Sequence, residues 1–176
     1  MIRAAALIAA LSLSMTTAAL AAPTVVTSPE PLPVAHDKPR VFLGGSIDMG
    51  KAVDWQAQMI AALADQDLVI LNPRRPDWNP AWKPVADEPE FRRQVEWELA
   101  ALETADVIVL YLTPGSQAPI SLLEMGLHAR TGKLVVLCPD GFWRKGNVDI
   151  TAQKYGVKQV ETLDALIAEV KARVKR

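Results

Sequence analysis

The sequence predicts a doubly wound α/β domain built on a five-stranded parallel sheet. Short apolar runs without polar alternation recur along the chain, which is typical of strands buried on both faces of a parallel sheet. Segments with apolar residues at helical spacing separate these runs. The chain has 176 residues, 50% of them hydrophobic, which suffices for one domain with a sizeable core but not for two.

The first half of the domain alternates strand, helix and strand. Residues 41–43 are apolar and run into Gly44 and Gly45, a pattern typical of a buried strand that ends in a tight turn. Residues 55–63 carry apolar side chains at helical spacing, and 68–71 form a second apolar run. These segments predict a strand, a helix and a second strand in that order.

A proline-rich loop over residues 72–89 follows the second strand. The loop is too long for a plain connection, and it carries Trp78 and Trp82. The two tryptophans are expected either to stack a base or to form the apolar core of a lid. We therefore place Trp78 among the candidate substrate-binding residues.

The second half repeats the alternation. Apolar residues lie on one face of a predicted helix at 91–104 and of a final helix at 162–174, and a helix at 121–130 is closed by Gly132. The remaining predicted strands are 107–112, 134–137 and a short one at 157–160. Five strands in this length favour a flavodoxin-like domain, in which ligands bind at the carboxyl ends of the strands.

Residues 1–21 have the organisation of a signal peptide. A short positive start that ends at Arg3 precedes an apolar stretch rich in Ala and Leu, and Ala19-Leu20-Ala21 offers a small-x-small cleavage pattern. A membrane anchor is the alternative, but the apolar run is short and is interrupted by Ser and Thr. We therefore expect export to the periplasm or the medium after cleavage near Ala21, without a stable membrane anchor.

The segment between the cleavage site and the first strand, residues 22–39, holds five prolines. It shows neither a helical nor a strand period, so we expect an extended leader there. The domain itself is then expected to span residues 40–176.

The balance of charges argues against a nucleic-acid polymer as a partner. The chain has 19 Lys and Arg against 20 Asp and Glu, so no basic surface for phosphates is indicated. The one cysteine, Cys138, allows no internal disulfide, and its place after the apolar run 134–137 indicates a buried residue rather than a nucleophile. No His, Cys and Asp grouping has metal-ligand spacing, and we expect neither a metal nor another cofactor.

Glu124 is the first candidate for chemistry. It lies in the segment 119–126, which is otherwise apolar except for Ser121. As a first-turn residue of the helix predicted at 121–130, it is expected at the ligand edge of the sheet, where the helix N-terminus favours its ionised form. The alternative is an ordinary glutamate that stabilises the start of a helix.

Glu98 is the second candidate. It lies on the predicted helix 91–104, and Glu96 cannot share its helical face, so at most one of the two points into the cleft. The alternative is a solvated helix face. Two carboxylates can divide the work of glycosidic cleavage, because one attacks the anomeric carbon while the other protonates the leaving group and later activates the acceptor.

The stretch Gly44-Gly45-Ser46 would let a ligand approach the backbone closely at the end of the first strand. It lacks the third glycine of a dinucleotide-binding fingerprint at the right spacing, so it is weak support for a nicotinamide cofactor. The chain has no Gly-x-Ser-x-Gly elbow, so serine hydrolase chemistry is unsupported.

Six short segments, taken in order, carry a resemblance to a known family. They are 41–47 (VFLGGSI), 71–78 (LNPRRPDW), 94–98 (QVEWE), 105–109 (ADVIV), 119–126 (PISLLEMG) and 141–148 (GFWRKGNV). They resemble the nucleoside 2-deoxyribosyltransferase family, in particular its deoxyribosyltransferase-like branch, and also the 2′-deoxynucleoside 5′-monophosphate N-glycosidases. Each motif is loose by itself, but their order and spacing over about residues 40–150 are fairly specific.

The resemblance implies roles for individual residues. The family's nucleophilic glutamate falls on Glu124, and its second acid, an aspartate in characterised members, falls on Glu98. The positions that the family places beside the sugar and near the ligand fall on Gly44, Gly45, Ser46 and Asn72.

Three residues depart from the family pattern. Phe42 stands where the family has a tyrosine that steadies the nucleophile, and Ala118 stands where relatives have a serine or an aspartate. Asp48 stands where the monophosphate enzymes have an arginine. Because an acid near a 5′-phosphate would repel it, we expect Asp48 to contact an unphosphorylated nucleoside or another ribosyl compound.

The resemblance implies cleavage or transfer of the N-glycosidic bond of (2′-deoxy)ribonucleosides through a glycosyl-enzyme on Glu124. Either a second base or water can resolve that intermediate, and both outcomes stay open. One alternative is a glycohydrolase for another ribosyl compound such as NAD, acting as a secreted effector. Another is a nucleoside-binding module without turnover, which the departures at Phe42 and Ala118 would favour. Family members assemble as dimers or larger, so a homo-oligomer is expected.

Overall fold

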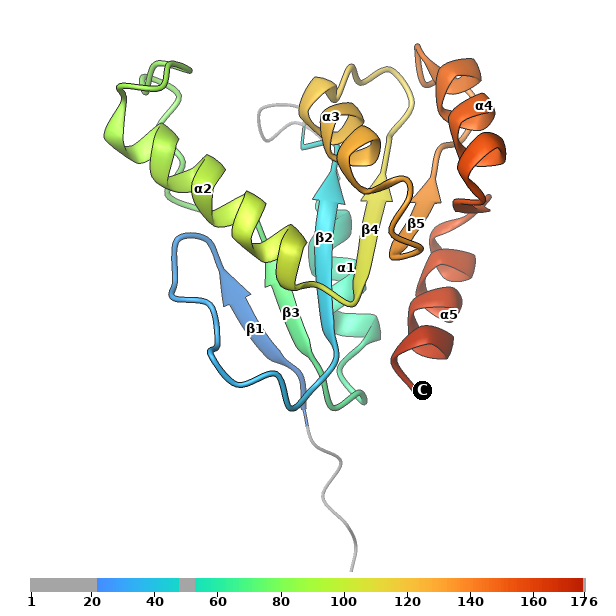
Figure 1. Ribbon diagram of the computed structural model, residues 1–176, viewed down its shortest axis with the longest axis horizontal. Coiled ribbons are helices and arrows are strands. Elements are labelled where there is room, and N and C mark those ends of the chain that lie inside the picture. The colour runs from blue at the N-terminus through green and yellow to red at the C-terminus, as the bar shows by residue number, and fades with distance from the viewer. Residues whose placement is uncertain (1–21, 48–52, 176) are drawn as a thin grey trace, which may run out of the picture.

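The computed structural model describes residues 22–47 and 53–175, and the expected signal peptide lies outside them. Within the described residues, six parallel strands form one sheet in the order β1-β3-β2-β4-β5-β6 (Figure 1). The strands are β1 (Thr24–Thr27), β2 (Arg40–Gly45), β3 (Val69–Asn72), β4 (Val107–Tyr111), β5 (Leu134–Leu137) and β6 (Lys158–Val160). The helices are α1 (Trp55–Ala62), α2 (Pro89–Thr104), α3 (Pro119–His128), α4 (Lys145–Tyr155) and α5 (Leu163–Val174).

The strand order confirms the doubly wound fold. Without β1, the order β3-β2-β4-β5-β6 is the second, first, third, fourth and fifth strand of a flavodoxin-like sheet. The chain winds from β2 to β3 on one side and then returns to β4 on the other side of β2. The switch point of the sheet therefore lies between β2 and β4, where ligands of such sheets bind.

Two apolar clusters cover the two faces of the sheet. One joins α2, α3 and α4 to one face, through residues that include Trp97, Met125 and Val148. The other joins α1 and α5 to the opposite face, through residues that include Trp55 and Leu166. In Figure 1, α2 and α3 lie in front of the strands and α1 lies behind them. Burial on both faces explains why these strands lack polar alternation.

Over the described ranges, the sheet has six strands where five were predicted, because residues within the expected leader form β1. Thr24–Thr27 pairs in parallel with β3 at the edge of the sheet. Val25 and Val26 favour a strand, but only Val26 of the two is buried, so the segment lacks the apolar run that marks the other strands. Its flanking residues Pro23 and Pro29 stand outside the strand and leave its ladder intact.

The rest of the segment 22–39 is fastened to the domain by polar contacts. The Arg40 guanidinium, which is buried, donates to the carbonyl groups of Pro33 and Ala35 at 2.8 and 2.7 Å. His36 pairs with Asp106 at 2.8 Å, and the same carboxylate oxygen accepts the backbone N–H of Arg40. The segment therefore packs on the domain rather than extending away from it.

Helix α4 is the second element that the sequence analysis does not predict. Its buried side chains are Val148 and Ala152, one helical turn apart, which is too weak a pattern to indicate an amphipathic helix. Gly156 ends it in a left-handed conformation with φ of 67°. Within residues 22–47 and 53–175, no helix has the length and apolar character to cross a membrane.

Candidate active site

A cavity of about 530 Å³ opens at the carboxyl edge of β2, beside the switch point of the sheet. The end of β2, the loop after β3, one face of α2 and the first turns of α3 enclose it. Of the eight candidate catalytic and substrate-binding residues, six line it: Gly44, Gly45, Ser46, Trp78, Glu98 and Glu124. The tertiary structure therefore brings the two candidate carboxylates to one cavity.

Glu124 lies deeper in its helix than expected. Helix α3 begins at Pro119, which suits the first helical position, so Glu124 falls in the second turn rather than the first. The helix N-terminus therefore does not favour its ionised form, because that effect fades beyond the first turn. The side chain is only 6% exposed. Burial, followed by the negative charge of Glu98, raises the pKa of the Glu124 carboxyl from 4.5 to about 8.

Glu98 reaches the cavity from α2. The amide of Gln94, one helical turn earlier, donates a hydrogen bond of 2.8 Å from Nε2 to Glu98 Oε1. Burial raises the pKa of the Glu98 carboxyl, and the bond from Gln94 opposes part of that rise. The negative charge of Glu98 adds to the cost of ionising Glu124, so the Glu124 carboxyl retains its proton near neutral pH in the absence of substrate.

Gly44 makes room for Glu124. A Cβ at position 44 would lie 3.1 Å from Glu124 Oε2, 2.9 Å from Phe42 Cε1 and 2.8 Å from Leu110 Cδ2. Gly45, with φ of 144°, passes so close to β4 that a Cβ would lie 2.3 Å from the carbonyl oxygen of Tyr111. The two glycines therefore serve close packing around the carboxylate and between β2 and β4.

Substituting Gly44 by Ala is expected to destabilise the protein by about 1–3 kcal/mol, because overpacking a rigid core forces its neighbours to move. Phe42 and Leu110 are fully buried and have no space to yield. Urea unfolding of the variant measures the effect. Gly126→Ala is the matched control, since nothing lies within 4 Å of a Cβ on this exposed helical glycine. The control is expected to gain about 0.5–1 kcal/mol from helix propensity. Equal stability of Gly44→Ala and wild type would contradict the packing role.

Ser46 lines the cavity, and its hydroxyl group already forms hydrogen bonds within the protein. Ser46 Oγ accepts the backbone N–H of Thr113 at 3.0 Å and lies 2.6 Å from Ser116 Oγ. Because the Ser116 hydroxyl donates to the carbonyl of Thr113, the proton between the two serines belongs to Ser46. These bonds tie the end of β2 to the loop after β4, and a contact of Ser46 with substrate stays a prediction.

The remaining predicted substrate-binding residues fall in three places. Asn72 caps the backbone N–H of Arg74 with its side-chain oxygen at 3.1 Å, and it is not among the residues that line the cavity. Asp48 lies outside the described residues. Trp78 lines the cavity and packs edge-to-face on Trp82, with ring centroids 5.2 Å apart. The two loop tryptophans thus pack on each other while Trp78 lines the cavity, and a contact of Trp78 with a base stays a prediction.

Sequence reasoning missed two arginines of the same loop that line the cavity. Arg74 donates to Gln56 Oε1 at 3.1 Å and lies 3.5 Å from Asp54. Arg75 holds Asp77 through two bonds of 2.7 Å. The signal was present in the pair of arginines after Asn-Pro at the end of the second strand, but sequence does not tell which loop side chains turn inward.

Two departures from the family pattern have visible structural consequences. Phe42 is fully buried, and its ring packs next to Gly44. Among the described residues, no group donates a hydrogen bond to Glu124. Ala118 precedes α3 with φ of 40°, a left-handed conformation that costs a residue with a Cβ about 1–3 kcal/mol. The cavity wall at Ala118 is thus a strained backbone without a polar side chain.

Other reactive groups lie apart from this chemistry. Cys138 is buried, as predicted, and burial raises the pKa of its thiol to about 11. Across the described part of the chain, no group of three or more His, Cys, Asp or Glu side chains could hold a metal ion. Of the described residues, the carboxylates that line the cavity are Glu98 and Glu124.

Comparison with known proteins places the chain in a family. A family model described as nucleoside 2-deoxyribosyltransferase like matches residues 38–142, more than half of the chain. The chain belongs to this nucleoside 2-deoxyribosyltransferase-like family. Its matched range includes both carboxylates and both glycines of the cavity, whereas β1, α4, β6 and α5 lie outside it.

A solved structure supports the fold of this family member. A conserved protein from Enterococcus faecalis V583 is similar to it with a TM-score of 0.56 and 16% sequence identity. The similarity covers 77% of this chain and 99% of the other. A search of curated proteins finds no match to the chain.

Proposed function

We propose that this family member cleaves or transfers the N-glycosidic bond of unphosphorylated nucleosides, with Glu124 as the nucleophile and Glu98 as the acid and base. The observation that carries the proposal is a pair of carboxylates on α2 and α3, Glu124 buried and Glu98 partly buried, that line one cavity at the switch point. Family membership supplies the class of reaction. The cavity, at about 530 Å³, lies in the range of small-molecule sites.

The proposed reaction has two steps. In the first, a Glu124 carboxylate oxygen forms a bond to C1′, the bond from C1′ to the base nitrogen breaks, and Glu98 gives its proton to the departing base. In the second, the Glu98 carboxylate takes a proton from water or from an acceptor base. The oxygen or nitrogen so activated then bonds to C1′ and releases Glu124. When the substrate is bound, the reaction therefore requires a proton on Glu98 and an ionised Glu124.

The environment of Glu124 suits a reactive nucleophile. Burial without a hydrogen-bond donor among the described residues leaves its carboxylate poorly solvated, which is why its pKa is raised to about 8. A poorly solvated carboxylate gains more from bonding to an electron-poor carbon than a solvated one does. Phe42, in place of the family's tyrosine, contributes to this condition because its ring is buried and offers no hydroxyl.

The charges near the cavity support a substrate without a 5′-phosphate. The two arginines that line it already face carboxylates, Arg74 near Asp54 at 3.5 Å and Arg75 on Asp77 at 2.7 Å. In the sequence, Asp48 directly follows the cavity-lining residue Ile47 and stands where the monophosphate enzymes have an arginine, so a negative charge replaces a positive one at this position. A phosphate would therefore compete with carboxylates already paired to these arginines.

A base-release assay tests the proposal. The chain from residue 22 is incubated with deoxyribonucleosides, ribonucleosides, their 5′-monophosphates and NAD, with and without a free acceptor base, and the products are separated by chromatography. We expect base release from nucleosides to exceed that from monophosphates. A new nucleoside in the presence of acceptor base indicates transfer, and its absence indicates hydrolysis. Identical background release by wild type and Glu124→Gln on every compound would sink the proposal.

A further inference from the structure

A chain of hydrogen bonds runs from the segment after β1 to Glu98. Ser28 Oγ donates to Gln94 Oε1 at 2.6 Å. The Gln94 amide then donates from Nε2 to Glu98 Oε1 at 2.8 Å and to the carbonyl of Pro73 at 2.9 Å. One amide group thus joins three segments of the chain: the end of β1, the loop after β3, and α2.

These bonds leave the Gln94 amide a single orientation. Both of its N–H groups have acceptors, and its oxygen has a donor. Turning the amide over would place its oxygen against two other oxygens, the carbonyl of Pro73 and the carboxylate of Glu98. Ser28 and Gln94 are 3% and 6% exposed, so water has little access to replace a lost partner.

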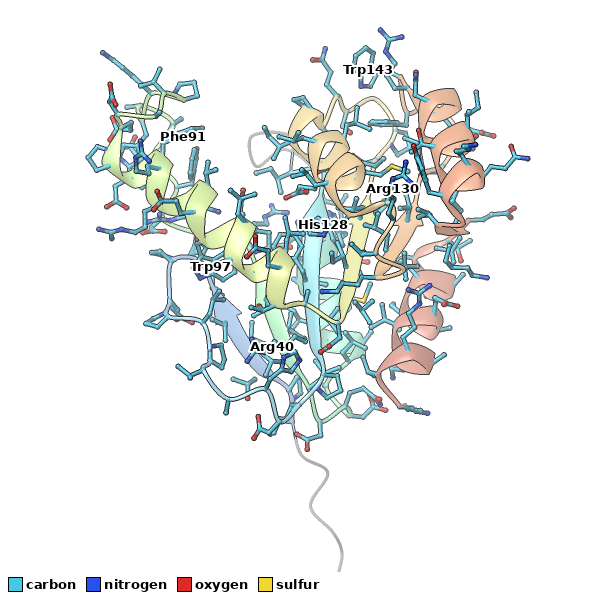
Figure 2. The ribbon with its side chains drawn as sticks, viewed as in Figure 1. Arg40, Phe91, Trp97, His128, Arg130 and Trp143 are labelled. Atoms are coloured by element: carbon cyan, nitrogen blue, oxygen red, sulfur yellow. The ribbon has the colours of Figure 1, made fainter. Side chains whose placement is uncertain are left out.

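Ser28 is itself held from two sides. Its backbone N–H donates to the carbonyl of Asn72 at 3.1 Å, which continues the pairing of β1 with β3. Two residues later, the carbonyl of Glu30 accepts the indole N–H of Trp97 at 2.7 Å. Trp97 extends from α2 toward this segment (Figure 2). The hydroxyl of Ser28 therefore has a defined place relative to α2.

We propose that Ser28 and Gln94 are positioning residues for Glu98, so that the segment 24–30 supports the active site. This inference rests on the proposed function, in which Glu98 acts as acid and base. The segment lies outside the range that matches the family, residues 38–142, whereas Gln94 and Glu98 lie within it. Ser28 and Gln94 act through Glu98 and need no contact with the substrate.

The hydrogen bond from Gln94 acts on the ionised form of Glu98. An N–H donor stabilises a carboxylate, so the bond lowers the pKa of Glu98 against the effect of burial. The other described charged side chains that line the cavity are Glu124, Arg74 and Arg75. Because the Gln94 amide both stabilises the Glu98 carboxylate and fixes its direction, loss of this hydrogen bond is expected to raise the pKa of Glu98 and to disturb its orientation.

Kinetics of Ser28 variants test the inference on a nucleoside that the wild type cleaves. Ser28→Ala removes one donor, and kcat is expected to fall about five- to tenfold with KM within about twofold of wild type. Ser28→Thr retains the hydroxyl and is expected to recover most of kcat. Thr27→Ala is the matched control, since it removes a hydroxyl from the neighbouring residue of β1 without touching Gln94. Equal losses of kcat in Ser28→Ala and Thr27→Ala would overturn the inference.

A measurement that needs no turnover separates this inference from the proposed function. The carboxyl groups of glutamate are labelled with carbon-13, and the titration of Glu98 is followed by NMR in wild type, Ser28→Ala and Gln94→Met. Methionine has a similar length but offers no hydrogen bond, so the pKa of Glu98 is expected to rise most in Gln94→Met. Unchanged titration of Glu98 in both variants overturns the positioning role. Absence of base release by wild type, with a shifted titration in the variants, would refute the proposed function alone.

Discussion

Glu124→Gln is expected to lower kcat/KM for base release by about 10⁴-fold or more, since an amide cannot form the ester to C1′ that the proposed reaction requires. The substitution is nearly isosteric, so the cavity and the packing against Gly44 should persist. Initial rates of base release, followed by chromatography over a range of substrate concentrations, measure the effect. Intact mass after rapid quenching is expected to reveal a glycosyl adduct on wild type and none on the variant.

Two further variants sharpen this expectation. Glu98→Gln is expected to lower kcat/KM for base release by about 10²- to 10⁴-fold, the usual contribution of general acid–base catalysis. The loss should be smallest with bases that depart easily. Glu96→Gln, two residues away on an exposed face of α2, is the matched control and should retain full activity because its ion pair with Arg92 lies at the surface. A Glu124→Gln variant within tenfold of wild type would remove Glu124 from the nucleophile role.

Glu124→Gln is also expected to stabilise the protein at alkaline pH. The pKa of Glu124 is about 8 in the folded protein against 4.5 for an ordinary glutamate. Between these values the folded state retains a proton that the unfolded state releases, so the stability of the wild type falls as pH rises through this window. Gln does not titrate, so the variant does not lose this stability. Its gain in unfolding free energy over wild type is absent below pH 4.5 and reaches as much as about 5 kcal/mol above pH 8.

Urea unfolding at several pH values from 5 to 9 checks this linkage. The difference in unfolding free energy between Glu124→Gln and wild type should grow with pH, whereas Glu96→Gln should follow wild type throughout. In Glu98→Gln the midpoint of the pH dependence should move to lower pH, because the charge of Glu98 is the second cause of the raised pKa of Glu124. A difference independent of pH would show that Glu124 titrates normally.

Most elements of the sheet could be predicted because each carries its own pattern. The strand at 134–137 is found with the predicted bounds, and the helix predicted at 91–104 is α2, Pro89–Thr104. Both have apolar residues at the spacing of the structure they form. In contrast, β1 and α4 bury few side chains and depend on the domain they pack against. Long-range pairing stabilises β1, and local pattern does not reveal it.

The candidate site was predictable in part for the same reason. Carboxyl ends of parallel strands meet at one edge, so the glycines after the first strand and the loops after the others were expected together. Gln94 was not singled out, because its partners Ser28 and Pro73 lie 66 and 21 residues away in the sequence. Nothing near these residues in the chain indicates that they meet.

By itself, the sequence determined the doubly wound fold and the candidacy of Glu98 and Glu124 at its ligand edge, because periodicity and chain order are local properties. Only the tertiary structure decided the state of those carboxylates. The sequence favoured an ionised Glu124 in a first helical turn, but α3 begins at Pro119 and buries it beside Glu98, which raises its pKa to about 8. The cost of ionising a carboxyl depends on lost water and on charges close in space, and both are settled when distant segments pack together.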